Sequence, residues 1–168
     1  MDYIYSLSEL MLSINHTRFL IVSMCALILS VCLYKTKKLT RTQGVMLVLI
    51  ITYSYLVLSL TILDRPYSSR MVRLMPLWSY PEIFRGNYRL LLEVIINVFM
   101  LMPLGFFLPA FKRFKTNGAI ALFGFLFSMT IEISQFIFMR GWFEFDDMIH
   151  NTLGIVIGYI IYKKIKKG

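Results

Sequence analysis

Six side chains able to bind a ligand or transfer a proton lie inside or at the edge of long apolar stretches of this 168-residue chain. They form three pairs at helical spacing: Glu93 and Asn97, Glu132 and Gln135, and Asp147 and Asn151. Carboxylates and amides are costly in hydrocarbon, so residues of this kind indicate a functional site by default. A carboxylate can transfer a proton or hold a cation, and an amide can recognise a polar ligand through hydrogen bonds.

The segment that joins the second and third pairs adds further charge beside them. It contains Arg140, Glu144 and Asp146. An arginine suits phosphate recognition, and neighbouring carboxylates could act as general bases or as ligands of a divalent cation. Because the acids show no fixed ligand spacing, we predict no metal and no cofactor. Internal ion pairs, such as Glu132 with Arg140 or Glu93 with Arg89, are the structural alternative to a functional site.

The composition indicates what kind of protein must position these residues. Hydrophobic residues make up 58% of the chain and charged residues 16%, against about 45–50% and about 25% in soluble domains. A water-soluble domain needs a charged exterior, and this chain has too few charges to build one. Its two cysteines cannot form a disulfide scaffold. The composition therefore excludes a disordered chain, a secreted miniprotein and an ordinary cytosolic enzyme, and it indicates an integral membrane protein.

Five segments approach the roughly 20 mostly apolar residues that a transmembrane helix needs. They are Thr17–Tyr34, Gly44–Leu63, Leu91–Phe111, Gly118–Met139 and Asp147–Tyr162. We therefore predict an all-α, polytopic membrane helix bundle with about five transmembrane helices. Its expected parts are an extracytoplasmic, interfacial N-terminal segment (1–16), a first helix with its cytoplasmic loop (17–43), a main membrane domain (44–162) and a basic cytoplasmic tail (163–168).

Basic residues follow the first, third and fifth predicted spans in segments without any acid. They are Lys35, Lys37, Lys38 and Arg41, then Lys112, Arg113 and Lys115, and finally Lys163, Lys164, Lys166 and Lys167. By the positive-inside rule these segments are cytoplasmic, which places the N-terminus outside and the C-terminus inside. The arginines of loop 64–90 oppose this orientation, but the reverse one would export more bases without accompanying acids. The net charge of +9 then reflects lysines facing anionic lipid, and we predict no nucleic-acid binding.

Small residues on two spans predict how the polar pairs meet. They are Gly124 and Ser128 on the fourth span and Gly154 and Gly158 on the fifth. Small residues let two helices approach closely, so we expect these two spans to pack through them in antiparallel fashion. The three polar pairs then lie at the same depth in the outer half of the membrane, which predicts an outward-facing polar pocket. In the third span Pro103 and Pro109 bracket Gly105, where we expect a kink or a break.

Motifs in the last two thirds of the chain resemble those of a known membrane protein family. The first is Leu74-Met75-Pro76-Leu77, and the second is Asn97 to Pro109, similar to N-x-x-x-F-x-P-x-G-F-x-L-P. The third runs from Ile131-Glu132-Ile133-Ser134-Gln135 through Arg140 and Asp146-Asp147 to Asn151-Thr152-x-Gly154-x-x-x-Gly158. Over roughly residues 45–162 this combination resembles the VanZ-like family. Two positions depart from its pattern: Glu144 stands where aspartate is commoner, and Arg73-Leu74-Met75-Pro76 lacks the usual asparagine.

The resemblance implies a teicoplanin-resistance-type protein of the bacterial cell membrane, associated with lowered susceptibility to lipoglycopeptide antibiotics. The family supplies no established catalytic residue, and the chain lacks the common hydrolase, zinc-protease and phosphate-loop motifs. The favoured hypothesis is a non-enzymatic factor in contact with membrane lipid, whose pocket binds the drug's lipid tail or a lipid-linked cell-wall precursor. The alternative is a membrane enzyme that modifies a lipid-linked surface glycan or phospholipid with its acidic residues. No internal repeat is visible, which disfavours a transporter.

Overall fold

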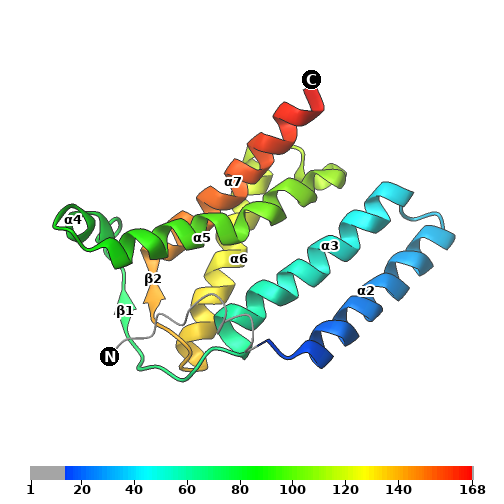
Figure 1. Ribbon diagram of the computed structural model, residues 1–168. Helices are drawn as coiled ribbons and strands as arrows, with labels where there is room; N and C mark the ends of the chain where they lie inside the picture. The colour runs from blue at the N-terminus through cyan, green and yellow to red at the C-terminus, as the bar shows by residue number, and fades with distance from the viewer. Residues whose placement is uncertain (1–13, 168) are drawn as a thin grey trace. The chain divides into compact units, whose positions relative to one another are not determined.

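The computed structural model describes residues 14–167 and divides the chain into two compact units, Met1–Tyr67 and Ser68–Gly168. Long helices dominate both units (Figure 1). The predicted class, an all-α membrane helix bundle, is confirmed by their length and apolar composition. Most of the expected interfacial N-terminal segment lies outside the described residues.

The first unit is a helical hairpin. Its elements are α2 (His16–Lys35), α3 (Arg41–Leu58) and the π-helix η1 (Ser59–Leu63), which continues α3. Near the turn of the hairpin, a Cβ built on Gly44 would lie 2.8 Å from the Ser30 hydroxyl oxygen, so the two helices approach closely there. At the opposite end the Arg18 guanidinium pairs with the Asp64 carboxylate at an N–O distance of 2.7 Å. Contacts at both ends thus hold the hairpin together.

The second unit packs three long helices around an apolar core. Its helices are α4 (Ser79–Phe84), α5 (Tyr88–Phe107), α6 (Asn117–Ile137) and α7 (Phe145–Lys167), with the 3-10 helices η2 (Leu108–Ala110) and η3 (Lys112–Phe114). α7 packs mainly against α5 and also against α6. Aliphatic side chains buried almost completely form the core, namely Leu101, Leu104, Ile120, Ile131, Met148 and Ile155.

Four helices within the described residues are long and apolar enough to cross a membrane. They are His16–Lys35, Arg41–Leu63, Tyr88–Ala110 and Asn117–Ile137, and they correspond to the first four predicted spans. α7 has 23 residues, which is also long enough. It carries Asp146, Asp147 and Asn151 in its first two turns and four lysines at its C-terminal end, which make it less apolar than the other four. The fifth span and the orientation therefore stay predictions.

Cysteine labelling in intact cells tests the predicted orientation. In a background with Cys25 and Cys32 replaced by serine, a cysteine at Ser69 is expected to react with a membrane-impermeant maleimide. Cysteines at Thr36 and Asn117 should react only after the cells are permeabilised, because the basic segments that contain them are predicted to be cytoplasmic. Labelling is read as a mass shift on a gel. A reaction at Asn117 in intact cells contradicts the orientation.

Two glycines of α7 lie against α5, which corrects the expected pairing of Gly154 and Gly158 with α6. A Cβ built on Gly154 would lie 2.0 Å from the carbonyl oxygen of Val98. A Cβ built on Gly158 would lie 1.9 Å from the carbonyl oxygen of Met102. Both partners are backbone atoms of α5, so no residue larger than glycine fits at either position without a shift of the helices.

The small residues of α6 lie against a different stripe of α7. Gly124 is in ordinary contact with Ile155 and Thr152, and the Ser128 hydroxyl accepts a hydrogen bond from Asn151. Positions 151 and 155 form one stripe, and the two glycines of α7 form the next stripe around the helix. α7 thus presents adjacent stripes to two neighbours, and residue spacing does not reveal which neighbour meets which stripe.

The third predicted span remains α-helical past its first proline. α5 continues through Pro103 and ends at Phe107, after which the chain turns through η2, which contains Pro109. Gly105 takes part in a helix contact: a Cβ there would lie 1.9 Å from the carbonyl oxygen of Ile155. It adds a third close backbone approach between α5 and α7. The expected kink at this position stays a prediction.

Candidate functional site

Asp146, in the first turn of α7, is buried and holds the loop that precedes α4. Its carboxylate accepts hydrogen bonds from the Ser79 backbone N–H at 3.1 Å and from the Ser79 hydroxyl at 2.7 Å. It also accepts one from the N–H of Leu77, a residue in the left-handed region with a φ of 58°. Asp146 is 2% exposed, and several donors to one carboxylate offset the cost of burying its charge. Asp146 therefore anchors the turn at residues 77–79.

Glu132, on α6, holds the loop between α6 and α7 in a similar way. It is 1% exposed, and its carboxylate accepts a hydrogen bond from the Glu144 backbone N–H at 3.1 Å. Glu144 belongs to β2 (Phe143–Glu144), which pairs in parallel with β1 (Val72–Arg73). The Arg73 guanidinium reaches the Glu144 carboxylate at 3.2 Å. A buried acid of α6 thus fixes a strand pair that joins two loops far apart in the sequence.

Arg73 lies against the two tryptophans of the chain. Its guanidinium carbon is 3.7 Å from the centre of the Trp78 ring and 4.9 Å from that of the Trp142 ring. The Trp142 indole N–H in turn donates to the Ser69 hydroxyl at 3.4 Å. Aromatic faces attract a guanidinium, and the Glu144 carboxylate holds it from another side. Arg73 is therefore a cation with a defined position on the loops.

Exposed apolar side chains occur on the same loop as this arginine and at the end of α4. They are Met71, Val72, Leu74, Met75, Leu77 and Phe84, which are between 43% and 86% exposed. We call this set, together with Arg73, the loop surface. Arg70 fastens the start of the loop, because its side chain donates to the carbonyls of Phe136 at 3.1 Å and Ile137 at 3.0 Å. These carbonyls end α6, where intrahelical donors are missing.

Two neighbouring residues of α7 bring polar atoms into the interior. Asn151 donates to the Ser128 hydroxyl at 2.8 Å, and His150 Nε2 lies 3.2 Å from the Tyr80 hydroxyl. Among residues 14–167, Asn151 Oδ1 and His150 Nδ1 are buried and have no hydrogen-bond partner. Leaving a buried polar atom unsatisfied costs roughly 1–3 kcal/mol. These two atoms are therefore points where a water molecule or a polar ligand group would be stabilised.

The predicted site residues lie on α5, on α6, on α7 and on the segment between α6 and α7. Glu132, Glu144, Asp146 and Asn151 take part in the contacts above, and Gln135 is buried on α6. Arg140 and Asp147 are half-buried, and Asn97 is half-buried on α5. The structure corrects the expected place of Glu93: its side chain is 49% exposed and pairs with Arg89 at 3.3 Å. Its part of α5 also carries the exposed Leu92 and Ile96, so this pair matches the ion-pair alternative.

Several residues of the site lie outside the predicted cluster. They are Arg73, Trp78, Ser79, Tyr80, Trp142 and His150. One feature of the sequence could have indicated them: each of the two tryptophans lies in a predicted outer loop that also contains arginine. No group of three or more His, Cys, Asp or Glu side chains that could hold a metal occurs among the described residues.

Comparison with known proteins identifies a family for this sequence. The family model described as VanZ/LLP1 matches residues 19–166. The chain belongs to the VanZ/LLP1 family. The family resemblance of the sequence motifs is thereby confirmed, and the VanZ/LLP1 match covers residues of both units. A curated relative, "Protein VanZ" of Enterococcus faecium, is 38% identical over 84 residues, which make up 49% of each chain. The match thus spans about half the length of that relative. No solved structure matches the chain.

Proposed function

We propose that this VanZ/LLP1 family member lowers the susceptibility of a bacterial cell to teicoplanin-type lipoglycopeptides. It would do so by binding the drug's lipid tail, or a lipid-linked cell-wall component, at an outward-facing site that includes the loop surface. The similarity to Protein VanZ of Enterococcus faecium supports the resistance role. The observation that carries the binding role is the loop surface, which combines exposed apolar side chains with the positioned guanidinium of Arg73.

The chemistry of the loop surface suits an amphiphile with an acidic group. Its apolar side chains can cover a lipid tail, and Arg73 can pair with a carboxylate or phosphate. Asp146 and Glu132 support this role indirectly, because they hold the loops that carry the surface.

Susceptibility to teicoplanin and to its deacylated form tests this function. Expression of the chain is expected to raise the inhibitory concentration of teicoplanin and to leave that of the deacylated drug unchanged. The double variant Leu74→Ser and Met75→Ser should lose most of the protection, because burying such side chains is worth about 1.5–3 kcal/mol each. Ile165→Ser, which removes a similarly exposed apolar side chain at the C-terminal end of α7, should keep it. Full protection by the double variant, at normal abundance, contradicts binding at the loop surface.

One observation favours a second candidate, a membrane enzyme that modifies a lipid-linked glycan or phospholipid. His150 Nε2 lies 3.2 Å from the Tyr80 hydroxyl, so the imidazole could act as a general base towards it. The carboxylates of Glu132 and Asp146 are instead engaged by backbone donors. A mass difference in extracted lipids that depends on the chain and disappears in Tyr80→Phe would favour the enzyme. Stoichiometric binding without turnover would favour the first function.

A further inference from the structure

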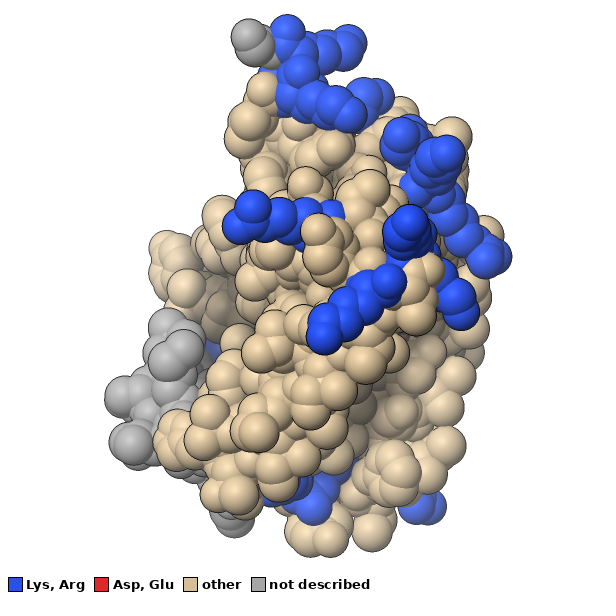
Figure 2. Space-filling view, turned by 90° about the vertical axis from the view of Figure 1, so that its right-hand side faces the viewer, with Lys and Arg blue, Asp and Glu red and all other residues tan. Residues whose placement is uncertain are grey.

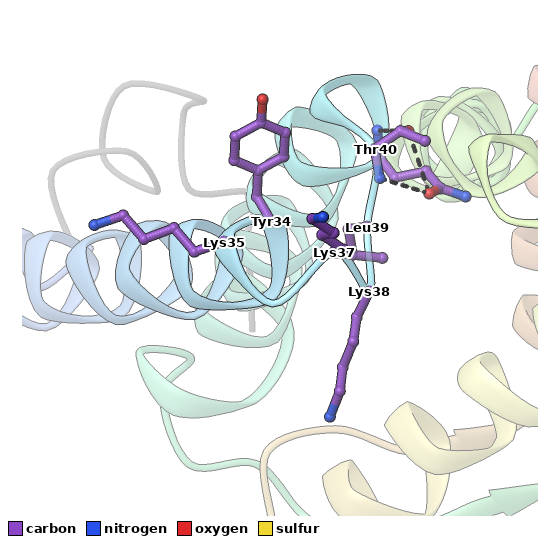
Figure 3. Close-up of a pocket in the computed structure, with 7 residues that line it drawn as sticks. Tyr34, Lys35, Lys37, Lys38, Leu39 and Thr40 are labelled. Atoms are coloured by element: carbon purple, nitrogen blue, oxygen red, sulfur yellow. Dashed lines mark hydrogen bonds between the residues drawn. The ribbon is translucent and has the colours of Figure 1, made fainter.

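The turn of the α2–α3 hairpin carries two adjoining cavities that the proposed function does not use. The first has a volume of about 430 Å³ and is lined by Tyr34, Lys35, Lys37, Lys38, Thr40 and Gln43, among others (Figure 3). The second, of about 320 Å³, lies between the two helices and is lined by Leu27, Val31, Val45, Val48, Leu49 and Arg41, among others. Both are open hollows on the surface of the hairpin, and they adjoin at Tyr34, which lines both.

The first cavity is basic. Its lining contains lysines and no acid, and the face drawn in Figure 2 likewise shows Lys and Arg side chains without Asp or Glu. Lys37 has the left-handed φ of 57°, which turns the chain sharply between the helices. Figure 3 shows Lys35 and Lys38 extending from the turn in different directions. Because a lysine ammonium sits on a flexible stem, these side chains can converge on a phosphate group.

The second cavity is an apolar groove with one basic end. Its walls are mainly aliphatic side chains from both helices, and Ser30 and Gly44, which also line it, mark the close approach of α2 and α3. Arg41 stands at the end that adjoins the basic cavity, because it is the first residue of α3 after the turn. Both helices are long and apolar enough to span a membrane. An acyl chain therefore matches the groove, and a phosphate matches its basic end.

We propose that the α2–α3 hairpin binds one anionic phospholipid, with an acyl chain in the groove and the phosphate in the basic cavity. Charge complementarity selects an anionic headgroup, because the basic cavity would repel the ammonium of a zwitterionic one. The lysines belong to a segment that is predicted to be cytoplasmic, where anionic headgroups are available. This lipid would be distinct from any ligand of the loop surface, since the site is formed entirely by residues of the first unit.

Native mass spectrometry of the full chain in detergent tests the proposal, with phosphatidylglycerol, phosphatidylcholine and inorganic phosphate as probes. One phosphatidylglycerol is expected to stay bound, with phosphatidylcholine retained about tenfold less. The double variant Lys37→Gln and Lys38→Gln should lower phosphatidylglycerol retention by about tenfold. The matched control Lys166→Gln and Lys167→Gln removes the same charge from α7 and should retain the lipid fully. If both double variants lose phosphatidylglycerol equally, retention depends only on the net charge of the protein, and the proposed site is wrong.

A variant of the groove separates a lipid from a free anion. Val45 is 53% exposed, so Val45→Trp can fill the groove without disturbing a packed core. This variant is expected to lower phosphatidylglycerol retention severalfold while its melting temperature stays unchanged. Unchanged lipid retention in Val45→Trp, or displacement of phosphatidylglycerol by an equal concentration of inorganic phosphate, would show an anion site without an acyl chain. Either result overturns the proposal.

Discussion

Gly158→Ala is expected to destabilise the second unit by about 1–3 kcal/mol or more, although it adds a single methyl group. The new Cβ would lie 1.9 Å from the carbonyl oxygen of Met102 and 3.0 Å from the backbone nitrogen of Phe106. Neither atom can rotate away as the end of a side chain could, so α5 and α7 must separate. The better helix propensity of alanine, worth about 1 kcal/mol, is too small to compensate.

Thermal unfolding of the purified chain in detergent measures this effect. Gly118→Ala is the matched control, because a Cβ built on Gly118 meets no atom within 4 Å. The control should keep or slightly raise the Tm, since it changes propensity alone, whereas Gly158→Ala should lower it clearly. Equal Tm values for the two variants would be incompatible with the close approach of α7 to α5.

Glu132→Gln and Asp147→Asn are each expected to abolish protection against teicoplanin while the protein stays in the membrane. The amide of a glutamine can still accept the hydrogen bond from the Glu144 N–H, so the fold is retained. Hydrogen bonds to a charged acceptor are roughly twice as strong as neutral ones, however. The strand pair that positions Arg73 is therefore held less firmly, and the loop surface loses its defined geometry. For Asp147 the expected loss rests on its place in the predicted cluster.

The measurement combines teicoplanin susceptibility with the abundance of each variant in the membrane. Glu93→Gln is the control. It also removes an acid from an apolar stretch, but Glu93 lies outside the cluster and pairs with Arg89. It should leave protection intact. Full protection in Glu132→Gln and Asp147→Asn at normal abundance would rule out a role for these acids in binding. Loss of protection together with loss of protein would assign them a purely structural role.

Local features of the sequence were sufficient for the class, for four of the long helices and for the family. The fourth predicted span, Gly118–Met139, closely matches α6 (Asn117–Ile137), and the first, Thr17–Tyr34, matches α2 (His16–Lys35). The length and polarity of each span are properties of contiguous residues, so they can be read without knowing what packs against it. The family motifs can also be read from the sequence alone, because the family match depends on residues in their order along the chain.

Contacts between distant segments were decided only by the tertiary structure. Helical spacing shows that Gly154 and Gly158 share a stripe, but the position of α5 around α7 determines which helix that stripe meets. The buried acids are a second case: the sequence suggested charged partners or ligands for them, but it did not indicate that Glu132 and Asp146 bind backbone N–H groups of loops. Every residue carries a backbone donor, so residue types cannot reveal which one a carboxylate reaches. Only the path of the whole chain brings those donors to the acids.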